Sequence, residues 1–142
     1  MSLYRVEIDG GSWGNPGEAG AGVVITFPDG RQEEHTVYLG QVTNNVAEYA
    51  ALLAALQRLA ALGAQEVEIL TDSQLLARQL SGEYQVRAPH LLPLYRKALA
   101  FLARLRSFRV HAIPREQNRR ADALAAQAIA AKRSTLPSPL AP

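Results

Sequence analysis

The sequence predicts an α/β domain with one mixed five-stranded sheet, flanked by helices, in the order βββαβααβα. Three observations lead to this fold class. Residues 3–39 alternate apolar and polar positions between short turns, which is typical of an antiparallel meander. Two later strand patterns each follow a helical pattern, which favours parallel pairing in the second half of the sheet. The 142 residues fit one domain, and they show neither an internal repeat nor a linker.

The first three strands are defined by alternation and by turn residues. Tyr4, Val6 and Ile8 are apolar and the residues between them are charged, so a strand begins the chain. Gly-Gly, Asn-Pro and Pro-Gly pairs follow at once, and we expect them to replace the strand by a turn or loop. Pro28-Asp29-Gly30 is a hairpin signal between the next two strands. The expected strands cover residues 3–9, 19–27 and 33–39, and the expected turn covers residues 10–17.

The middle of the chain alternates helix and strand. Thr43-Asn44-Asn45 supplies capping residues for a helix that runs to about residue 62, and Gly63 supplies its stop signal. An apolar strand follows over residues 66–71. Asp72-Ser73 is expected to cap the next helix, which ends near Gly82.

The last third begins with a connector over residues 83–90. A helix is expected over residues 91–105, with its regular part starting at Pro93, and a strand over residues 108–113. A loop over residues 114–117 precedes Asn118, which we expect to cap a final helix over residues 119–131. Residues 136–142 contain three prolines and no periodicity, which indicates disorder. We therefore divide the chain into a domain over residues 1–132 and a disordered tail over residues 133–142.

Composition excludes several classes of protein. No apolar run approaches the ~20 residues that a membrane span needs, and the N-terminus shows no apolar signal-peptide region. With zero cysteines there is neither a disulfide framework nor a thiolate metal site, which agrees with a cytoplasmic protein. The net charge is only +2, so bulk charge does not indicate a nucleic-acid binder. Such a function would depend on where the charges are placed.

Four acidic residues stand in half-buried contexts. Asp9 and Asp72 each end an apolar strand, and ligands of α/β sheets bind just beyond such ends. Glu48 and Asp122 each lie at the edge of a core-facing helical stripe. We hypothesise that the four carboxylates meet and hold divalent cations, because carboxylates brought close together repel one another. Oxygen-only ligands suit Mg²⁺ and Mn²⁺, and two such ions activate water in phosphodiester hydrolysis.

Each acid also has a simpler explanation when it is taken alone. Asp72 fits a helix N-cap and Asp9 fits a turn. Glu48 fits a favourable charge near a helix N-terminus, and Asp122 fits a solvated helix position. Spacing and polarity alone favour these simpler explanations, because capping and turn roles are common uses of aspartate.

Four sequence blocks, taken together, resemble those of type 1 ribonuclease H in its short form without a basic protrusion. The resemblance covers roughly residues 3–131, in the family's order and on the expected elements. The blocks are Tyr-x-Val-x-Ile-Asp-Gly-Gly-Ser-x-Gly-Asn-Pro-Gly at residues 4–17, Thr43-Asn44-Asn45-Val46-Ala47-Glu48-Tyr49, Thr71-Asp72-Ser73-Gln74, and Asn118-Arg119-Arg120-Ala121-Asp122-Ala123-Leu124-Ala125.

This resemblance implies the ribonuclease H-like fold and an endonuclease that cuts the RNA strand of an RNA–DNA hybrid. It places Asp9, Glu48, Asp72 and Asp122 on the family's catalytic and metal-binding positions. The implied cofactor is a pair of Mg²⁺ ions, with Mn²⁺ as a substitute. One ion would position and deprotonate the attacking water, and the other would stabilise the departing 3′-oxygen. The products would carry 5′-phosphate and 3′-hydroxyl ends.

The resemblance also suggests residues that contact the hybrid. Glycines allow close backbone approach to 2′-hydroxyl groups, and amide side chains both donate and accept hydrogen bonds. Turn and cap geometry would explain the glycines and Thr43 equally well, and either Asn44 or Asn45 could cap the helix. The suggested contacts are Gly10, Gly11, Ser12, Asn15, Asn44, Asn45, Ser73 and Gln74, with Thr43 resembling part of a pocket for a DNA phosphate.

The sequence departs from the family pattern at two places. Many members carry a histidine in the loop before the last acid, where it is thought to help product release. Here that loop holds Arg115 and Glu116, so one of them takes this role or the step proceeds without it. His111 is expected in the fifth strand.

The second departure is the connector, which lacks the basic, tryptophan-containing protrusion of some members. We therefore expect weaker hybrid binding, with basic residues elsewhere making up part of the loss. The candidates for this role are Arg96, Lys97, Arg115, Arg119 and Arg120.

Three other interpretations stay open. The chain could be another nuclease or integrase-like enzyme on the same fold, a non-catalytic nucleic-acid-binding module, or a domain cut from a larger polymerase or fusion protein. The combination of Asn44 and Glu48 with the Thr71-Asp72-Ser73-Gln74 block argues against the first, and the four acids argue against the second. Met1 and the Pro-rich end favour a free-standing protein. The resemblance suggests a monomer that binds neither a membrane nor an obligate protein partner.

Overall fold

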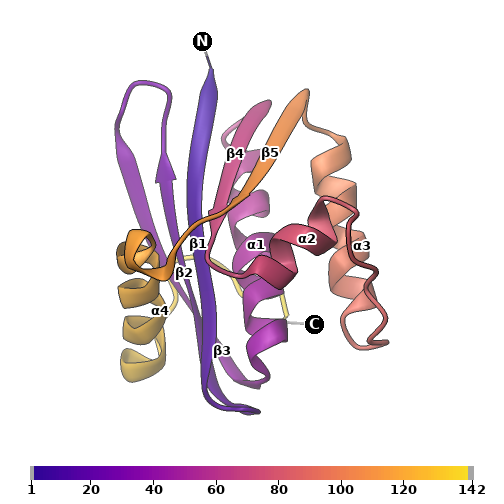
Figure 1. Cartoon of the computed structure of the whole chain (residues 1–142). Coiled ribbons are helices and arrows are strands. Elements are labelled where there is room, and N and C mark those ends of the chain that lie inside the picture. The colour runs from indigo at the N-terminus through magenta and orange to yellow at the C-terminus, as the bar shows by residue number, and fades with distance from the viewer. Residues whose placement is uncertain (1, 141–142) are drawn as a thin grey trace.

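The elements follow the predicted order along the chain. The computed structural model describes residues 2–140 (Figure 1). None of the helices in this part of the chain is both long enough and apolar enough to cross a membrane. The strands are β1 (Leu3–Gly14), β2 (Gly17–Thr26), β3 (Gln32–Val42), β4 (Glu66–Thr71) and β5 (Ser107–Ala112). The helices are α1 (Asn44–Ala61), α2 (Gln74–Leu80), α3 (Leu92–Ala103) and α4 (Arg119–Ala131), with a 3₁₀ turn, η1 (Arg115–Gln117), in the predicted loop.

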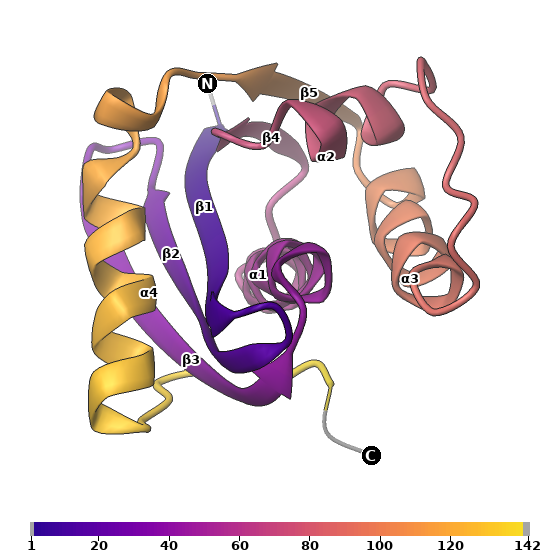
Figure 2. The ribbon, with the colours of Figure 1, turned by 60° about the horizontal axis from the view of Figure 1, so that its bottom comes forward.

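The five strands form one mixed sheet in the spatial order β3-β2-β1-β4-β5. β2 pairs antiparallel with β1 and β3, and β4 pairs parallel with β1 and β5. The predicted meander and parallel half are therefore confirmed. α1 packs on one face of the sheet with α3 on its outer side, and α4 covers the opposite face over the meander (Figure 2).

β1 is longer than predicted, because it continues through both glycines to Gly14. Every residue from 5 to 14 has an antiparallel partner in β2, and this pairing outweighs the local turn tendency of the glycines. The expected turn over residues 10–17 is therefore wrong for residues 10–14 and for Gly17, which begins β2. The turn is confined to Asn15 and Pro16, which are joined by a cis peptide bond.

α1 supplies the centre of the core. The sheet covers one of its sides and α3 another, so it is buried over more of its surface than the single predicted stripe. Leu52 and Leu53 are fully buried, and burying each stabilises the fold by about 1.5–3 kcal/mol. The Tyr49 hydroxyl donates to Oε1 of Gln79 at 2.6 Å, which ties α1 to α2. These contacts hold the helix that carries Glu48.

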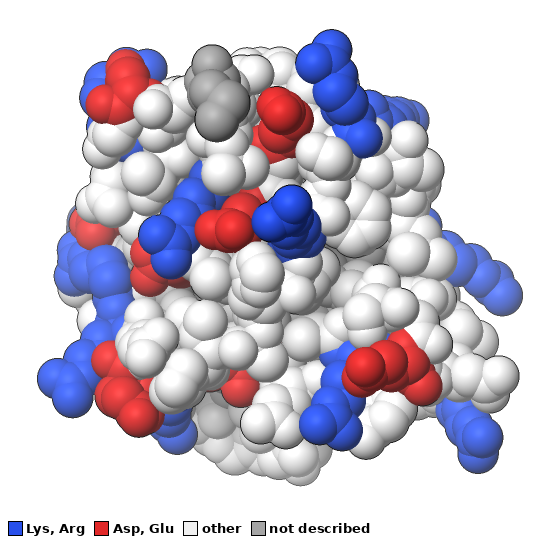
Figure 3. Space-filling view, turned by 45° about the horizontal axis from the view of Figure 1, so that its top comes forward, with Lys and Arg blue, Asp and Glu red and all other residues white. Residues whose placement is uncertain are grey.

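Many charged side chains on the surface form ion pairs with one another. Arg120 donates two hydrogen bonds to the Glu34 carboxylate, and Arg58 donates two to Glu33. Basic and acidic side chains are interspersed on the face shown in Figure 3. Arg120 is therefore a weaker candidate for binding a polyanion than its position in the sequence suggests.

Residues 133–140 lie against β3, in contrast to the predicted disorder. The Thr135 N–H donates to the Thr36 carbonyl at 2.7 Å, and the Thr135 hydroxyl accepts from the Thr36 N–H at 3.0 Å. The Ser134 hydroxyl accepts from the Tyr38 N–H at 2.8 Å. β3 is an edge strand, so its unpaired backbone groups offer this segment partners that the local sequence does not reveal. The predicted disorder of residues 141–142 lies outside the described residues.

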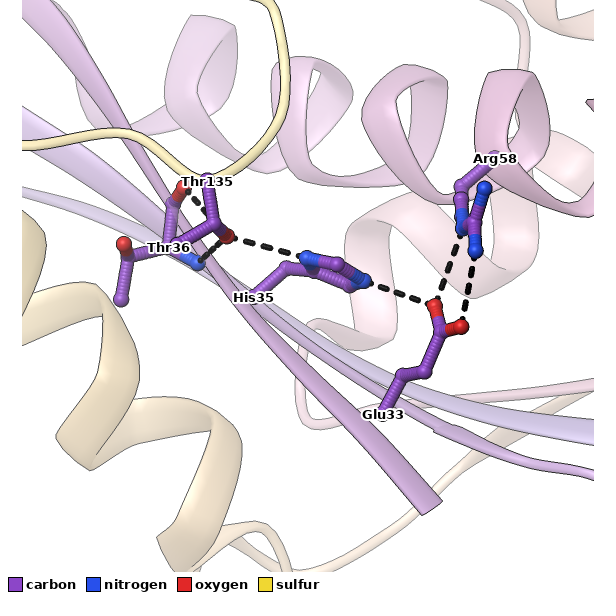
Figure 4. A network of polar contacts seen from close by, with 5 residues as sticks. All are labelled: Glu33, His35, Thr36, Arg58 and Thr135. Atoms are coloured by element: carbon purple, nitrogen blue, oxygen red, sulfur yellow. Dashed lines mark hydrogen bonds and ion pairs between the residues drawn. The ribbon is translucent and has the colours of Figure 1, made fainter. Parts of the chain in front are cut away.

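A chain of polar contacts extends from this segment to α1 (Figure 4). Thr135 Oγ1 lies 2.9 Å from Nδ1 of His35, and Nε2 of His35 lies 2.8 Å from Oε1 of Glu33. Glu33 in turn accepts two hydrogen bonds from Arg58, which hold the pKa of its carboxyl down at about 2. The C-terminal segment, the edge strand and α1 are thus joined on the side of the sheet away from β5.

Candidate active site

The four predicted acids line one pocket. Asp9, Glu48, Asp72 and Asp122 border the same cavity of about 290 Å³. This volume is large enough to hold several water molecules. All four side chains are half-buried, and each comes from a different segment of the fold.

Parallel pairing of β1 with β4 places Asp9 beside Asp72. The register pairs Ile8 with Thr71, so each aspartate is the next residue beyond the carboxyl end of that pairing. The cap of α2 is Ser73, whose hydroxyl accepts from the Leu76 N–H at 3.1 Å. Asp72 therefore does not serve as the expected cap, and its carboxylate faces the pocket instead.

Two glycines let the helical acids approach the sheet. A Cβ at Gly10 would lie only 2.1 Å from the carbonyl oxygen of Ala47, so α1 can approach β1 this closely only where β1 has no side chain. Glu48 follows Ala47 and is thereby held next to Asp9. On β2, a Cβ at Gly22 would lie 2.1 Å from the carbonyl oxygen of Ala121, the residue before Asp122. A larger residue at either glycine would displace the helix and its acid.

Burial and mutual repulsion perturb the acids. Burial raises the pKa of Asp9 to about 8, with further increases from the Asp72 charge, from a hydrogen bond with Asp122 and from the charges of Asp122 and Glu48. Burial also raises the pKa of Glu48, against a lowering hydrogen bond from Ser73. It raises the pKa of Asp72 as well, against the lowering effect of Arg115. The pocket thus favours either a bound proton or a bound cation.

Arg115 is the basic side chain of the pocket. Its Nη2 lies 3.9 Å from Oδ1 of Asp122, and the side chain is 80% exposed. Glu116 belongs to the same turn but does not line the pocket. Of the two candidates in the loop before the last acid, Arg115 is the one beside the carboxylates. His111 lies in β5, as predicted, and contacts Glu68 at 3.3 Å.

Asn44 joins the β1–β2 hairpin to α1. Its Oδ1 accepts from the Ser12 N–H at 2.9 Å and from the Ser12 hydroxyl at 3.1 Å. The Asn44 N–H donates to Oδ1 of Asn15 at 3.1 Å. Thr43 is the cap of α1 and accepts from the Val46 N–H at 3.3 Å, so neither Asn44 nor Asn45 has this role.

The suggested substrate contacts fall into two groups. Some line the pocket beside the acids, and the others do not line it, two of them serving as helix caps. The first group is Gly10, Gly11, Ser12 and Asn44. The second is Asn15, Thr43, Asn45, Ser73 and Gln74.

Asn118 has a different role from the expected helix cap. Its side chain is fully buried and makes no cap hydrogen bond. Its Nδ2 donates to the Ile8 carbonyl at 2.9 Å, so it ties the start of α4 to the residue before Asp9. Among residues 2–140, no hydrogen-bond partner of its Oδ1 is found. The local pattern of Asn before a helix predicts a cap, and only the tertiary contact reveals this role.

The pocket also includes residues that the sequence did not suggest. Trp13 lines it from β1, and three small or branched apolar residues line it from α4. Once β1 extends to Gly14, strand alternation places Trp13 on the same side as Asp9, which is the only indication in the sequence. The residues of α4 are Ala125, Ala126 and Ile129.

The donor set fits hard divalent cations. All four acids offer carboxylate oxygens, which Mg²⁺ and Mn²⁺ prefer. A cation would also offset the burial and the carboxylate repulsion that together raise the pKa of Asp9. Within residues 2–140, no three acidic or histidine side chains converge into a closed ligand cluster. The four carboxylates nevertheless line one shared pocket.

Comparison with known proteins gives a consistent result. A family model described as Reverse transcriptase-like matches residues 7–128. The bifunctional protein Rv2228c of Mycobacterium tuberculosis is 43% identical over 126 residues, which are 87% of this chain and 35% of that protein. The ribonuclease HI of Halobacterium salinarum is 40% identical over 122 residues, which are 85% of this chain and 61% of that protein. The chain thus spans about a third of the mycobacterial relative and under two thirds of the halobacterial one.

Solved structures share the fold. RNase H1 from the halophilic archaeon Halobacterium salinarum has a TM-score of 0.87 and 38% identity, covering 91% of this chain and 98% of that chain. LC11-RNase H1, solved in complex with an RNA/DNA hybrid, has a TM-score of 0.85 and 41% identity, with the same coverage. Both likenesses confirm the predicted α/β fold class and its mixed sheet.

Proposed function

Because the chain belongs to the type 1 ribonuclease H family, we propose that it is an endonuclease that hydrolyses the RNA strand of RNA–DNA hybrids. The observation that carries this proposal is the gathering of Asp9, Glu48, Asp72 and Asp122 around one pocket. The hybrid bound by LC11-RNase H1 supports the substrate class. In this proposal residues 1–132 form the catalytic domain.

The four carboxylates act as ligands of divalent cations. Two Mg²⁺ ions, or Mn²⁺ in their place, would activate the attacking water and stabilise charge on the departing 3′-oxygen, giving 5′-phosphate and 3′-hydroxyl ends. Because burial and the neighbouring carboxylates raise the pKa of Asp9 to about 8, cation binding near pH 7 would release its proton. The contacts of β1 with β4 and α1 hold Asp9, Asp72 and Glu48 in place, so little reorganisation is needed.

The rim between the hairpin and α1 would contact the RNA strand. A Cβ at Gly11 would meet nothing within 4 Å, so the backbone there is open to approach from the pocket. Asn44 already accepts two hydrogen bonds through Oδ1, which orients its amide group towards this rim. Side-chain amides and backbone groups at such a rim can recognise 2′-hydroxyl groups, which distinguish RNA from DNA.

Arg115 is our candidate for product release in place of the loop histidine. It is exposed, it lies in a short turn, and it pairs loosely with Asp122. An arginine that alternates between Asp122 and the new 5′-phosphate would help the product leave. Glu116 is less suited to this step because it would repel the phosphate and does not line the pocket.

The test is a cleavage assay with a labelled RNA–DNA hybrid, duplex RNA, duplex DNA and single-stranded RNA, in Mg²⁺, Mn²⁺ or EDTA. We expect metal-dependent cleavage of the hybrid's RNA strand only. Asp72→Asn should abolish it, because the variant removes one ligand charge from the pocket. Asp29→Asn is the matched control: Asp29 lies in the exposed β2–β3 turn and pairs with Arg31, so activity should be retained.

Each other outcome has a distinct meaning. Cleavage that persists in Asp72→Asn would place the reaction outside this pocket. Binding of the hybrid without cleavage in any metal would favour a non-catalytic module on the same fold. Cleavage of duplex DNA would indicate a different nuclease. Product ends are read from ligation and phosphatase sensitivity of the fragments.

A further inference from the structure

Trp13 is an exposed aromatic residue inside the candidate active site. Its residue surface is 60% exposed, the largest exposure among the large apolar residues of the described chain. It nevertheless lines the pocket that holds the four acids. An exposed tryptophan within a polar pocket is unusual, because water contact with an indole ring is unfavourable.

The strand geometry sets the distance between Trp13 and the acids. Asp9, Gly11 and Trp13 alternate onto one side of β1, whereas Gly10 faces α1. Four strand residues span about 13 Å. The pocket is therefore elongated along β1, with the carboxylates at one end and Trp13 towards the other.

α4 forms the opposite wall at this end but leaves the indole open. Ala125 and Ala126 are small, and Ile129 is the one large apolar side chain that α4 adds to the lining. The pocket is thus acidic at one end and apolar at the other. A ligand that fits both ends needs a group that binds cations and, roughly 13 Å away, a flat or apolar surface.

A nucleic-acid strand has this combination. Its phosphates bind at metal ions, and its bases and sugars offer apolar faces that pack on aromatic side chains. The indole N–H is a further donor, available to a 2′-hydroxyl group. Because about 13 Å of strand separates the backbone positions of Asp9 and Trp13, Trp13 would meet a nucleotide that flanks the scissile phosphate.

We propose that Trp13 is a positioning residue that packs against a nucleotide of the RNA strand beside the scissile phosphate. This inference rests on the proposed function. It assigns a role in substrate binding to the apolar end of the pocket. Because Trp13 is remote from the carboxylates, it sets the register and affinity of the RNA strand and leaves the chemical step to the acids.

The chain contains a single tryptophan, so its fluorescence reports on Trp13 alone. The experiment uses the Asp72→Asn form to prevent cleavage, with Mg²⁺ and an RNA–DNA hybrid, while anisotropy of a label on the hybrid measures binding. We expect the tryptophan emission to change with the same midpoint as the anisotropy, and iodide to quench it less in the complex. Binding without either change overturns the inference and leaves the proposed function intact.

Variants provide the second readout. In the active protein, Trp13→Ala should raise KM for the hybrid about tenfold with kcat changed less than about twofold, since loss of aromatic stacking weakens binding. Trp13→Phe should keep most of the affinity, which a purely steric role would not require. Phe108→Ala is the control, because Phe108 is 39% exposed but lines a different surface on β5.

The remaining outcomes are also decisive. An unchanged KM in Trp13→Ala, with thermal unfolding like that of the parent, overturns the inference. Equal loss of affinity in Trp13→Ala and Phe108→Ala does the same, because it shows a general effect on the fold. Failure of the parent protein both to bind and to cleave the hybrid would instead remove the proposed function.

Discussion

Asp9 combines burial with three neighbouring carboxylates, and these raise its pKa to about 8. The unfolded chain releases this proton near pH 4. Between these values the folded, metal-free protein holds more protons than the unfolded chain. Its free energy of unfolding therefore falls as pH rises from about 4 to about 8. A bound cation removes this dependence because it favours the charged carboxylate.

We predict that Asp9→Asn weakens this pH dependence in EDTA, because the amide does not titrate. Urea unfolding at about pH 5 and about pH 8 measures it. The parent protein should lose stability between the two values, and the variant should lose clearly less. Adding Mg²⁺ at about pH 8 should stabilise the parent more than the variant. Equal pH slopes in the two proteins would show that Asp9 is not the titrating group.

At the scale of elements, the contact between β1 and α1 positions two of the acids. Gly10 is the point of closest approach, and Glu48 begins the next turn of the helix. The antiparallel pairing of β1 with β2 fixes the glycine in place from the other side. The site therefore depends on a backbone contact that no side chain at this position could replace.

We predict that Gly10→Ala destabilises the protein by about 1–3 kcal/mol or more, because its methyl group would overlap the Ala47 carbonyl. Cleavage should fall together with stability as α1 and Glu48 move away. Gly11→Ala is the matched control: its methyl group meets nothing within 4 Å, so stability should change little. Urea unfolding of both variants, with an activity assay, makes the comparison. Equal stability of the two variants would contradict the close approach seen at Gly10.

The C-terminal segment shows how an element can be missed by local reasoning. Its three prolines and lack of periodicity suggest disorder, yet Ser134 and Thr135 bond to the edge strand. Asn118 and the Gly-Gly pair differ from their local sequence pattern for the same reason. In each case a partner distant in sequence outweighs the local tendency.

At the scale of the whole molecule, the sequence predicted the element order and the sheet well. The alternation in β1 and the caps before α1 and α2 depend only on residues that are close together in the sequence, so they could be predicted from it. The four acids could be proposed as a metal site from the ends of apolar strands and the edges of helical stripes. The resemblance to the family's sequence blocks favoured this proposal over capping, turn and surface roles. The role of Asn118 could not be predicted, because it depends on how α4 packs across the sheet. The position of Trp13 could not be predicted either, because it depends on the pairing with β2 that extends β1 to Gly14.

Without a basic protrusion, binding of a polyanion would depend on basic side chains elsewhere on the surface that are not already in ion pairs. Arg119 lies three residues before Asp122 and therefore on the same side of α4. It is exposed, and within residues 2–140 no ion pair to it is found. Arg120 instead points to β3 and binds Glu34.

We predict that Arg119→Ala weakens hybrid binding and lowers the slope of log affinity against log salt by about 1. Arg120→Ala should have a smaller effect, because its hydrogen bonds are already made to Glu34. Titrations at several salt concentrations measure both variants. If neither variant changes affinity, the start of α4 lies outside the hybrid interface, and Arg96 and Lys97 on α3 become the candidates.

β1 pairs with β4, although β2, β3 and α1 lie between these two strands in the sequence. Asp122 arrives later still, on the final helix. During synthesis on the ribosome, the chain folds from its N-terminus as it emerges. The nascent chain therefore cannot assemble all four acids until α4 has left the exit tunnel. Any activity that requires all four acids can therefore appear only after α4 has been synthesised and has packed on the sheet.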